Sequence, residues 1–176
     1  MSSWRQWGWP KPGDVLVIDN GGRMDEGCIG DLTVLEAKAC QLGSMIVWGC
    51  HQVVELKRIG FPIFSYGTCS AGPQRLDLRD QDALVTTCFG DFKVGREDVV
   101  FANADGVLFS PSQRADELLS AANTIWRTER RQAEALQAGK KLRQQLQFDE
   151  YLAKRSSDSA YTFHRHLRDI GGAIEE

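Results

Sequence analysis

The chain has no long apolar run and no paired cysteine motif. None of its 176 residues belongs to a stretch of roughly 18–20 apolar residues, the length that a membrane-spanning helix needs. The segment before Pro12 lacks the apolar core of a signal peptide. The five cysteines are odd in number, widely spaced and without a Cys-x-x-Cys pair, which fits neither a disulfide framework nor a zinc site. We therefore expect most of them to be small buried hydrophobes in a reducing, cytoplasmic setting.

Nucleotide-binding signatures are also absent. No Gly-Lys-Ser/Thr sequence indicates a P-loop, and Gly21, Gly22 and Gly27 do not match the Gly-x-Gly-x-x-Gly fingerprint. The three histidines are too scattered for a His-rich metal site. Lys and Arg number 21 against 24 Asp and Glu, a net charge of -3, which argues against a nucleic-acid footprint over the whole surface. Neither a membrane nor a nucleic acid is an expected partner.

What the sequence does contain is a strand–helix–strand pattern. Residues 15–18 and 45–48 are short apolar runs that predict buried strands. Between them, a glycine-rich loop over residues 19–30 leads to a helix that begins near Asp31 and stops at Gly43. This order predicts a βαβ crossover and hence a parallel strand pair. Helical spacing predicts the buried face of the helix to be Leu32, Leu35, Ala39 and Leu42.

The following segment predicts antiparallel structure. Residues 51–59 favour a short helix, and Pro62 makes residues 61–66 an edge or irregular strand. Residues 83–94 and 99–109 each have apolar runs on both sides of a turn, which predicts two strand–turn–strand units. The expected fold is therefore α/β: a layered αββα-type sandwich with a central βαβ unit, antiparallel hairpins and a C-terminal helical extension.

The extension is expected to begin with a capped helix. Ser110 is the predicted cap, Pro111 the first helical residue and Gln113 the partner in a capping box. Good helix formers follow, and Gly139 is expected to separate two helices. The histidines of the polar tail, including His166, are expected to be solvated. One apolar face of the first helix is marked by Leu118, Ala122, Ile125 and Trp126. We expect two domains, an α/β core over residues 1–111 and a helical extension over residues 112–176.

The junction between the glycine loop and the first helix is a candidate anion site. Gly30 allows a ligand to approach the backbone closely. The amides of Asp31, Leu32 and Thr33 lie in the first helical turn, where N–H groups have no intrahelical partner. With the helix dipole they form a cradle suited to a carboxylate or a phosphate. The alternative is a plain strand–helix turn in which Asp31 is only an acid at the helix start.

A second candidate segment follows the strand at residues 45–48. Ligands of α/β sheets lie beyond the C-terminal ends of parallel strands, which would place His51 and Gln52 at the same edge as Gly30. The alternative is the start of a surface helix, with Glu55 in solvent.

Several segments together resemble the RraA-like family. They are residues 12–19, 30–32, 47–49 and 102–107. The family contains the 4-hydroxy-4-methyl-2-oxoglutarate/4-carboxy-4-hydroxy-2-oxoadipate aldolases, which also act as oxaloacetate decarboxylases, and the regulator of ribonuclease E activity. The resemblance covers about residues 11–111 and implies a core shortened at its N-terminus. The segment from Phe148 to the C-terminus resembles the extension of one subgroup.

The resemblance implies a two-part site. In the aldolases, backbone amides of a Gly-Asp-x-x turn hold the substrate carboxylate; here that turn is Gly30-Asp31-Leu32-Thr33. An Arg-Asp pair then binds the keto acid and a divalent metal, usually Mg²⁺, which stabilises a pyruvate enolate. Counting from Gly49 places Gln52 and Val53 at the pair, whereas a one-residue deletion places His51 and Gln52 there. Neither Gln52 nor Val53 is a good Mg²⁺ ligand, and in either alignment no arginine or carboxylate remains.

Three hypotheses follow. The chain is a metal-assisted lyase that releases pyruvate, a non-catalytic binding or regulatory protein like the ribonuclease regulator, or a degenerate paralogue. The expected ligand is a pyruvate-like keto acid, and the resemblance implies a homotrimer or a hexamer. The basic stretch over residues 127–143 either serves a partner or is a solvated helix face, since glutamates are interspersed in it.

Overall fold

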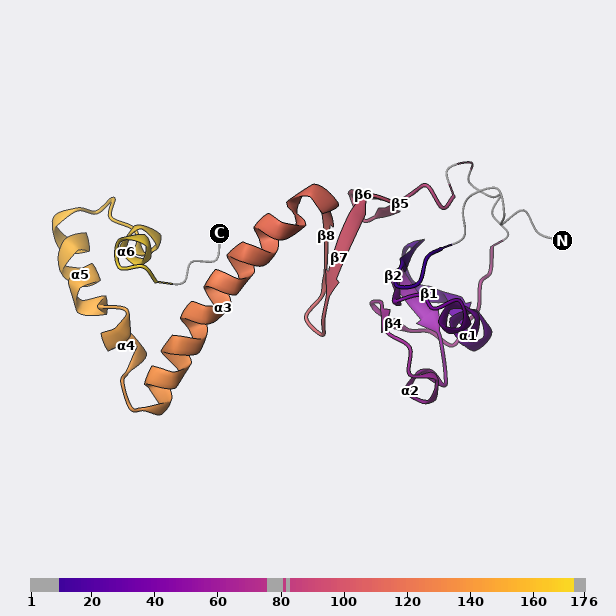
Figure 1. Ribbon diagram of the computed structural model, residues 1–176, viewed down its shortest axis with the longest axis horizontal. Helices are drawn as coiled ribbons and strands as arrows, with labels where there is room; N and C mark the ends of the chain where they lie inside the picture. The colour runs from indigo at the N-terminus through magenta and orange to yellow at the C-terminus, as the bar shows by residue number, and fades with distance from the viewer. Residues whose placement is uncertain (1–9, 76–80, 82, 173–176) are drawn as a thin grey trace. The chain divides into compact units, whose positions relative to one another are not determined.

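The computed structural model describes residues 10–75, 81 and 83–172 (Figure 1). The chain divides into two compact units, Met1–Ser112 and Gln113–Glu176. Among the described residues, no helix has the length and apolar character needed to cross a membrane. The two units are described in turn.

The predicted βαβ unit is confirmed. Strand β1 (Val15–Gly30) is followed by helix α1 (Asp31–Ala39) and strand β2 (Ser44–Gln52), and β1 pairs with β2 in parallel from its first residues onward. On the other side of β2, the short strands β3 (Ile63–Phe64) and β4 (Gly67–Thr68) also pair in parallel. The C-terminal ends of β1 and β2 therefore lie at one edge of the sheet.

The predicted glycine loop is in fact the second half of β1. The pairing with β2 continues after Asp19 but with three register shifts, at which β1 uses several residues opposite one residue of β2. Such bulges bend a strand and redirect its end. They bring Gly27 opposite Cys50 and Gly30 opposite Gln52. Periodicity did not reveal this, because bulged pairing has no regular spacing of apolar residues.

The predicted helix over residues 51–59 was too long. His51 and Gln52 belong to β2, where His51 pairs with Thr68 of β4, and helix α2 covers only Leu56–Ile59. The parallel partner strand extends β2 beyond Trp48, where the sequence pattern had ended it.

The predicted buried face of α1 was wrong except for Leu42, which follows the helix and packs against the core. Val34 and Ala37 are the buried residues of the helix, whereas Leu32 is 82% exposed and Leu35 47% exposed. The bulged end of β1 sets where the helix begins, and this fixes which residues face the sheet. Among the described residues, the core cluster contains eight buried side chains, from β1, α1, β2 and the segment after β2: Ile29, Val34, Ala37, Met45, Val47, Val53, Ile59 and Phe61.

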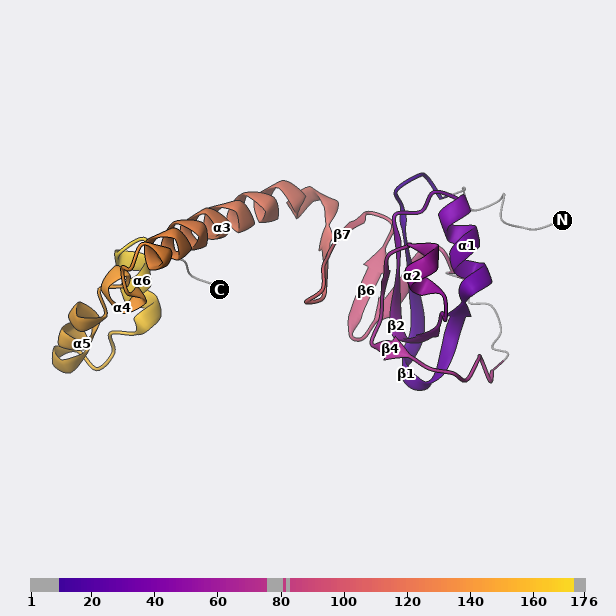
Figure 2. The same cartoon turned by 90° about the horizontal axis from the view of Figure 1, so that it is seen from below.

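Both predicted antiparallel units are present. Strands β5 (Thr86–Phe89) and β6 (Phe92–Gly95) form one hairpin, and β7 (Asp98–Ala102) and β8 (Val107–Pro111) form another (Figure 2). The ring of Phe89 lies 6.4 Å from that of Trp48 on β2 and 5.4 Å from that of Phe109 on β8. Aromatic contacts thus join the hairpins to the parallel sheet. The mixed α/β fold with antiparallel hairpins and C-terminal helices is confirmed.

The cysteines are less buried than predicted. Cys50 is buried, Cys28, Cys40 and Cys69 are half-buried, and Cys88 is exposed. Burial raises the pKa of Cys28 to about 11, so its thiol stays protonated at neutral pH.

Helix formation after β8 begins later than the capping motif predicted. Ser110 and Pro111 complete β8, where they pair with Val99 and Asp98. A 3-10 turn (Ser112–Arg114) precedes helix α3 (Ala115–Gln137), whose cap is Arg114. The pairing of β8 with β7 keeps Ser110 and Pro111 in the strand, although the local sequence favours a helix cap there. Gly139 follows the helix in a left-handed conformation and ends it, as predicted.

One histidine of the tail, His166, is packed rather than solvated. Helices α4 (Leu142–Gln145), α5 (Phe148–Ser157) and α6 (Phe163–Asp169) enclose His166, which is fully buried. Its Nε2 donates to the carbonyl of Leu146 at 2.9 Å, and Tyr151 lies 5.6 Å from its ring. His164 is exposed. The prediction therefore failed for His166, because aromatic residues from separate helices converge on it.

Candidate functional site

A hollow of about 360 Å³ lies at the N-terminus of α1. All the residues that the sequence singled out as substrate-binding, together with one more, line it: Gly30, Asp31, Leu32, Thr33, Gln52 and Val54. The pairing of Gly30 with Gln52 brings the two segments together. The hollow thus lies at the C-terminal edge of two parallel strands, where α/β proteins place ligands.

The first turn of α1 is open to this hollow. Gly30 is the N-terminal cap, in an extended conformation, and no side chain among the described residues caps the helix. The Asp31 carboxylate is used elsewhere: its Oδ1 accepts from the amides of Val54 at 3.0 Å and Glu55 at 3.1 Å. Asp31 therefore fixes the segment after β2. The helix amides at this end carry the positive end of the dipole, which favours an anion.

Gly27 allows the two strands to approach closely beside the hollow. A Cβ atom at this residue would lie 2.7 Å from the backbone nitrogen of Gln52. The Gly27 amide donates to the carbonyl of Ala71 at 2.8 Å. The absence of a side chain at Gly27 is therefore a condition for placing Gln52 opposite Gly30.

The Gln52 side chain is oriented by the segment after β4. Its Nε2 donates to the carbonyl of Ser70 at 2.8 Å. Gly72 is close to the other end of the amide, since a Cβ there would lie 3.2 Å from Gln52 Oε1. The side-chain amide of Gln52 is therefore an uncharged group of fixed orientation in the lining of the hollow.

Glu26 anchors the same segment and was not identified from the sequence. This carboxylate is only 4% exposed and accepts from the amide of Gln74 at 2.8 Å and from Arg75 Nε at 2.7 Å. Arg23 lies 3.3 Å away. These contacts, the Gln74 amide first, hold the pKa of Glu26 below its usual value. No pattern distinguishes Glu26 from the other acidic residues around it, so no sequence signal pointed to it.

The lowered pKa of Glu26 makes the free energy of unfolding of the N-terminal unit depend on pH in the acid range. A carboxylate whose pKa is lower in the folded state stabilises the protein above its unfolded pKa and loses this effect as the pH falls through its folded pKa. We expect the free energy of unfolding to decrease as the pH is lowered below about 4.5, the unperturbed value. Glu26→Gln should flatten this dependence in urea titrations at a series of pH values.

Glu55→Gln is the matched control for that measurement. Glu55 pairs with Arg58 at 2.9 Å, but both side chains are exposed, so the pair contributes little. An unchanged pH profile in Glu26→Gln would show that Glu26 does not stabilise the unit.

The two other residues considered for the metal pair lie outside the hollow. Val53 is buried in the core. His51 is 5% exposed, and its Nδ1 lies 2.8 Å from Ser65 Oγ. Burial lowers the pKa of His51, so it is neutral at pH 7. Its Nε2 has no hydrogen-bond partner in the described part of the chain.

These residues do not fit a magnesium site. Within residues 10–75, 81 and 83–172, no group of three or more His, Cys, Asp and Glu side chains converges to hold an ion. In the hollow, the one carboxylate is that of Asp31, whose Oδ1 already accepts two amides. Mg²⁺ requires oxygen ligands in near-octahedral geometry. Gln52 offers one neutral amide oxygen and Val54 offers none, which together with Asp31 is too few for such a site.

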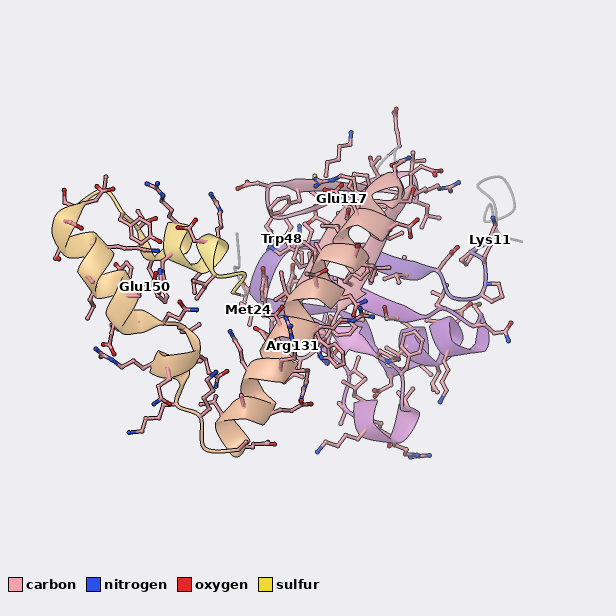
Figure 3. All side chains as sticks on the ribbon, turned by 60° about the vertical axis from the view of Figure 1, so that its left-hand side comes forward. Lys11, Met24, Trp48, Glu117, Arg131 and Glu150 are labelled. Carbon is pink, nitrogen blue, oxygen red and sulfur yellow. The ribbon has the colours of Figure 1, made fainter. Side chains whose placement is uncertain are left out.

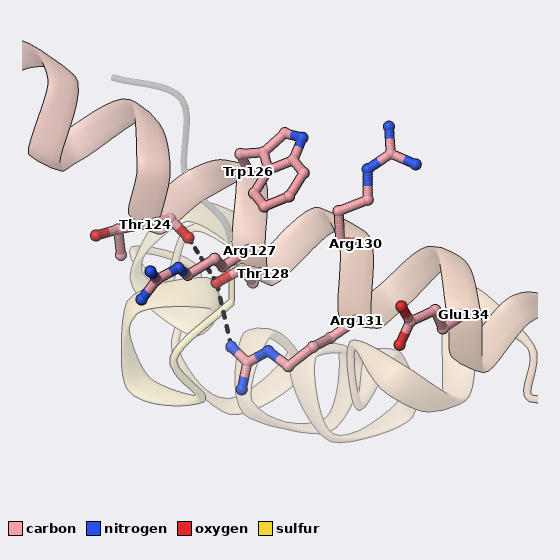
Figure 4. A pocket seen from close by; sticks show the side chains of 7 residues that line it. All are labelled: Thr124, Trp126, Arg127, Thr128, Arg130, Arg131 and Glu134. Atoms are coloured by element: carbon pink, nitrogen blue, oxygen red, sulfur yellow. Dashed lines mark hydrogen bonds between the residues drawn. The ribbon is translucent and has the colours of Figure 1, made fainter.

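A larger hollow, of about 640 Å³, lies on α3 alone (Figure 4). It contains part of the basic stretch, and Arg131 donates there to Thr128 at 3.2 Å. It has no strand ends and its walls come from one helix. The lining residues are Thr124, Trp126, Arg127, Thr128, Arg130, Arg131 and Glu134. We therefore place the candidate ligand site at the smaller hollow.

The fold and this hollow define a class of protein. It is an α/β protein in which the uncapped N-terminus of a helix, suited to an anion, lies at the edge of a parallel sheet. The sequence profile of the family described as "RraA-like: Aldolase/RraA" matches residues 8–109. The chain belongs to this RraA-like family.

Relatives carry names of two kinds. A putative 4-hydroxy-4-methyl-2-oxoglutarate aldolase from Halalkalibacterium halodurans is 28% identical over 112 residues, 63% of this chain and 52% of the relative. Protein DlpA of Legionella pneumophila is 29% identical over 133 residues, 74% of this chain and 21% of the relative. The chain thus spans about half or less of the length of these two relatives.

Two solved structures share the fold. An uncharacterized protein from Pseudomonas syringae superposes with a TM-score of 0.65 at 23% identity, over 77% of this chain and 68% of that one. RraAS2 of Streptomyces coelicolor, described as an unusual member of the RNase ES inhibitor RraA protein family, gives a TM-score of 0.58 at 28% identity. This second match covers 68% of this chain and 61% of RraAS2.

Proposed function

We propose that this chain binds a small carboxylate of the pyruvate-like keto-acid class at the N-terminus of α1, without metal-assisted carbon–carbon bond cleavage. The open first turn of α1 opposite Gln52 is the observation that carries the proposal. The amides of Leu32 and Thr33 would hold the carboxylate, and the Gln52 amide would contact the keto oxygen or a carboxylate oxygen. Backbone N–H groups at a helix N-terminus can bind an anion without a metal.

The same residues argue against lyase turnover. Divalent metal stabilises the enolate that forms when pyruvate is released, an effect worth several kcal/mol in general. Here Gln52 is uncharged and Val53 lies in the core, so neither position supplies a carboxylate to the hollow. The ligand would bind, but its developing negative charge would lack the cation that accelerates cleavage.

The alternative function is a metal-dependent aldolase or oxaloacetate decarboxylase. It is supported by the names of the aldolase relatives and by the hollow itself. A purely regulatory role is the other alternative, supported by the RraAS2 neighbour and by the lack of a metal pair. We favour ligand binding without turnover because the hollow offers N–H donors for a carboxylate but not the side chains that would hold a divalent metal.

The proposal includes a homotrimer or a hexamer. Two apolar side chains at the rim of the hollow, Leu32 and Val54, are 82% and 84% exposed. Large apolar side chains exposed beside a binding site are typical of surfaces that another chain covers. A neighbouring subunit at this rim would also exclude water from the ligand.

The test is a titration of oxalate and pyruvate by isothermal calorimetry, with Mg²⁺ and with EDTA. We expect binding that does not depend on metal and that Gln52→Ala weakens by about 3–10-fold, the value of one or two lost hydrogen bonds. Gln137→Ala, at the end of α3, is the control. Mg²⁺-dependent pyruvate release from oxaloacetate, abolished by Gln52→Ala, would instead establish the lyase. No heat with any of the acids would refute the site.

A further inference from the structure

Two cysteines that are distant in the sequence lie side by side on the parallel sheet. Cys50 is on β2 and pairs with Gly67 of β4. Cys69 follows β4 and continues the pairing, because its amide donates to the carbonyl of His51 at 2.9 Å. Side chains alternate between the two faces of a strand, so Cys69, two residues after Gly67, shares a face with Cys50. Both cysteines belong to the unit Met1–Ser112, and their contact lies within it.

The two thiols also have neighbouring acceptors on β1. Cys50 Sγ donates to the carbonyl of Glu26 at 3.2 Å. Cys69 Sγ donates to the carbonyl of the preceding residue, Asp25, at 3.1 Å. Burial, and after it the neighbouring Cys69 thiol, raise the pKa of Cys50. The register of β2 with β4 and the two acceptors on β1 thus bring these thiols next to each other.

The two thiols differ in their access to solvent. Cys50 is completely buried, whereas Cys69 is half-buried. Met24, which precedes Asp25 on β1 and is labelled in Figure 3, lies over the same part of the sheet, with its terminal methyl 3.8 Å from the position that a Cβ of Gly67 would take. A small oxidant therefore reaches Cys69 first, and Cys50 is the thiol beside it.

Cys28 is close to Cys50 but in a different environment. Its side chain packs against the core cluster that contains Val34 and Ala37 of α1. Its Sγ lies 3.9 Å from the backbone carbonyl of Cys50, so it contacts the main chain of that residue. Cys69 is therefore the better partner for the Cys50 thiol.

We propose that Cys50 and Cys69 are a redox pair that a hydroperoxide converts reversibly into a disulfide. The Cys69 sulfur attacks one oxygen of hydrogen peroxide; an S–O bond forms, the O–O bond breaks, and the other oxygen leaves as water. The Cys50 sulfur then attacks this sulfenic acid; the S–S bond forms, the S–O bond breaks, and the oxygen leaves with the Cys50 proton as a second water. The thiols together lose two electrons, which the peroxide gains, and a thiol reductant reverses the step by exchange.

Formation of this bond has a consequence for the hollow at α1. Diagonal neighbours on one face of a sheet have Cα atoms about 7–8 Å apart, whereas a disulfide needs about 4.4–6.8 Å. Cys69 lies beyond the end of β4, a strand of two residues, so this segment is the part that moves. The next residue is Ser70, whose carbonyl accepts from Gln52 Nε2 at 2.8 Å. The disulfide therefore releases the Gln52 amide and weakens carboxylate binding, a consequence that rests on the proposed function.

The first test is the thiol state of the full chain after treatment with hydrogen peroxide. N-ethylmaleimide blocks the remaining thiols, and tandem mass spectrometry of the digested chain locates any disulfide. We expect two thiols to be lost, Cys50 to be linked to Cys69, and dithiothreitol to restore both. A link from Cys50 to Cys28 would overturn the proposal, as would the lack of any link under conditions that oxidise the exposed Cys88.

Single substitutions separate the two steps. Cys69→Ser removes the thiol that reacts first, so no link within the chain should form. Cys50→Ala keeps that thiol but removes its partner, so Cys69 should remain a sulfenic acid, detected as a dimedone adduct, or proceed to the sulfinic acid. Cys28→Ser is the matched control and should form the link as the wild type does.

The half-buried Cys69 makes Cys69→Ser the milder of the two substitutions, and a far-ultraviolet circular dichroism spectrum like that of the wild type shows that it folds. Loss of two thiols in this variant, as in the wild type, would refute the pair. A lack of any Cys69 oxidation in Cys50→Ala would refute the order of the two steps.

The oxalate titration, repeated on the reduced and on the oxidised chain, tests the consequence for the hollow. We expect oxidation to weaken binding by about 3–10-fold, as Gln52→Ala does in the reduced chain, and to cause no further loss in Gln52→Ala. Equal affinity of the two forms would overturn the connection to Gln52. A reduced chain that binds no oxalate would refute the proposed function and this consequence, whereas the disulfide mapping decides the redox pair separately.

Discussion

Gly27→Ala is expected to destabilise the N-terminal unit and to abolish ligand binding together. The added Cβ would lie 2.7 Å from the nitrogen of Gln52 and 2.8 Å from the carbonyl carbon of His51. Both are backbone atoms of β2, so no side-chain rotation relieves the contact. Overpacking of this kind costs about 1–3 kcal/mol. The strands must separate at the point where Gly30 and Gln52 are paired.

Urea unfolding followed by circular dichroism measures the loss of stability, and the oxalate titration measures the loss of the site. Gly106→Ala is the matched control: it lies in the turn between β7 and β8, and a Cβ there meets no atom within 4 Å. We expect that variant to unfold at the wild-type urea concentration. If Gly27→Ala kept both the wild-type midpoint and its oxalate affinity, the close approach of the strands would not be what forms the hollow.

The elements that the sequence predicted well are those marked by continuous apolar runs or by turn residues. The β-branched runs at residues 15–18 and 45–48 and the hairpin turns carry local signals that the structure retains. The bulged half of β1 carries none, because its path depends on where Gly27 and Gly30 meet β2. The apolar face of α1 then depends on that path, which is why Leu32 and Leu35 were misplaced.

The candidate site was predictable in position but incomplete in composition. From the sequence alone, the rule that parallel strands end at one edge of a sheet predicted that Gly30 and Gln52 lie at the same edge. Val54 and Glu26 were missed because their positions depend on hydrogen bonds far apart in the sequence, such as those from Val54 to Asp31 and from Gln74 to Glu26. His166 was missed for the same reason, since its burial requires three separate helices.

Val53→Asp is expected to destabilise the chain rather than to restore a metal ligand. Val53 is 5% exposed in the core cluster, so an aspartate there would lie among the apolar side chains of that cluster. Burial raises the pKa of such a carboxyl by up to 3–5 units, and a rise of three units corresponds to about 4 kcal/mol at pH 7. Combined with Gln52→Arg, it recreates the family's pair in sequence but not in the hollow.

The expected loss depends on pH in a direction that identifies its cause. An acid whose pKa is higher in the folded state binds its proton more tightly there, so the unfolded state gains as the pH rises above about 4. Val53→Asp should therefore be least destabilised near pH 4, where only the pH-independent cost of burying a polar group in place of valine remains, and should lose about a further 1.4 kcal/mol per pH unit above that. Urea titrations between pH 4 and pH 7 measure this slope.

Val54→Asp is the matched control, with the same change one residue along. Val54 is 84% exposed at the rim of the hollow, so its replacement should change the free energy of unfolding by less than about 0.5 kcal/mol at any of these pH values. A flat pH profile for Val53→Asp as well would mean that its carboxylate reaches solvent or the hollow. In that event a side chain at residue 53 could reach a cation. The absence of a metal site would then follow from valine being unable to bind a metal, and not from the burial of this residue in the core.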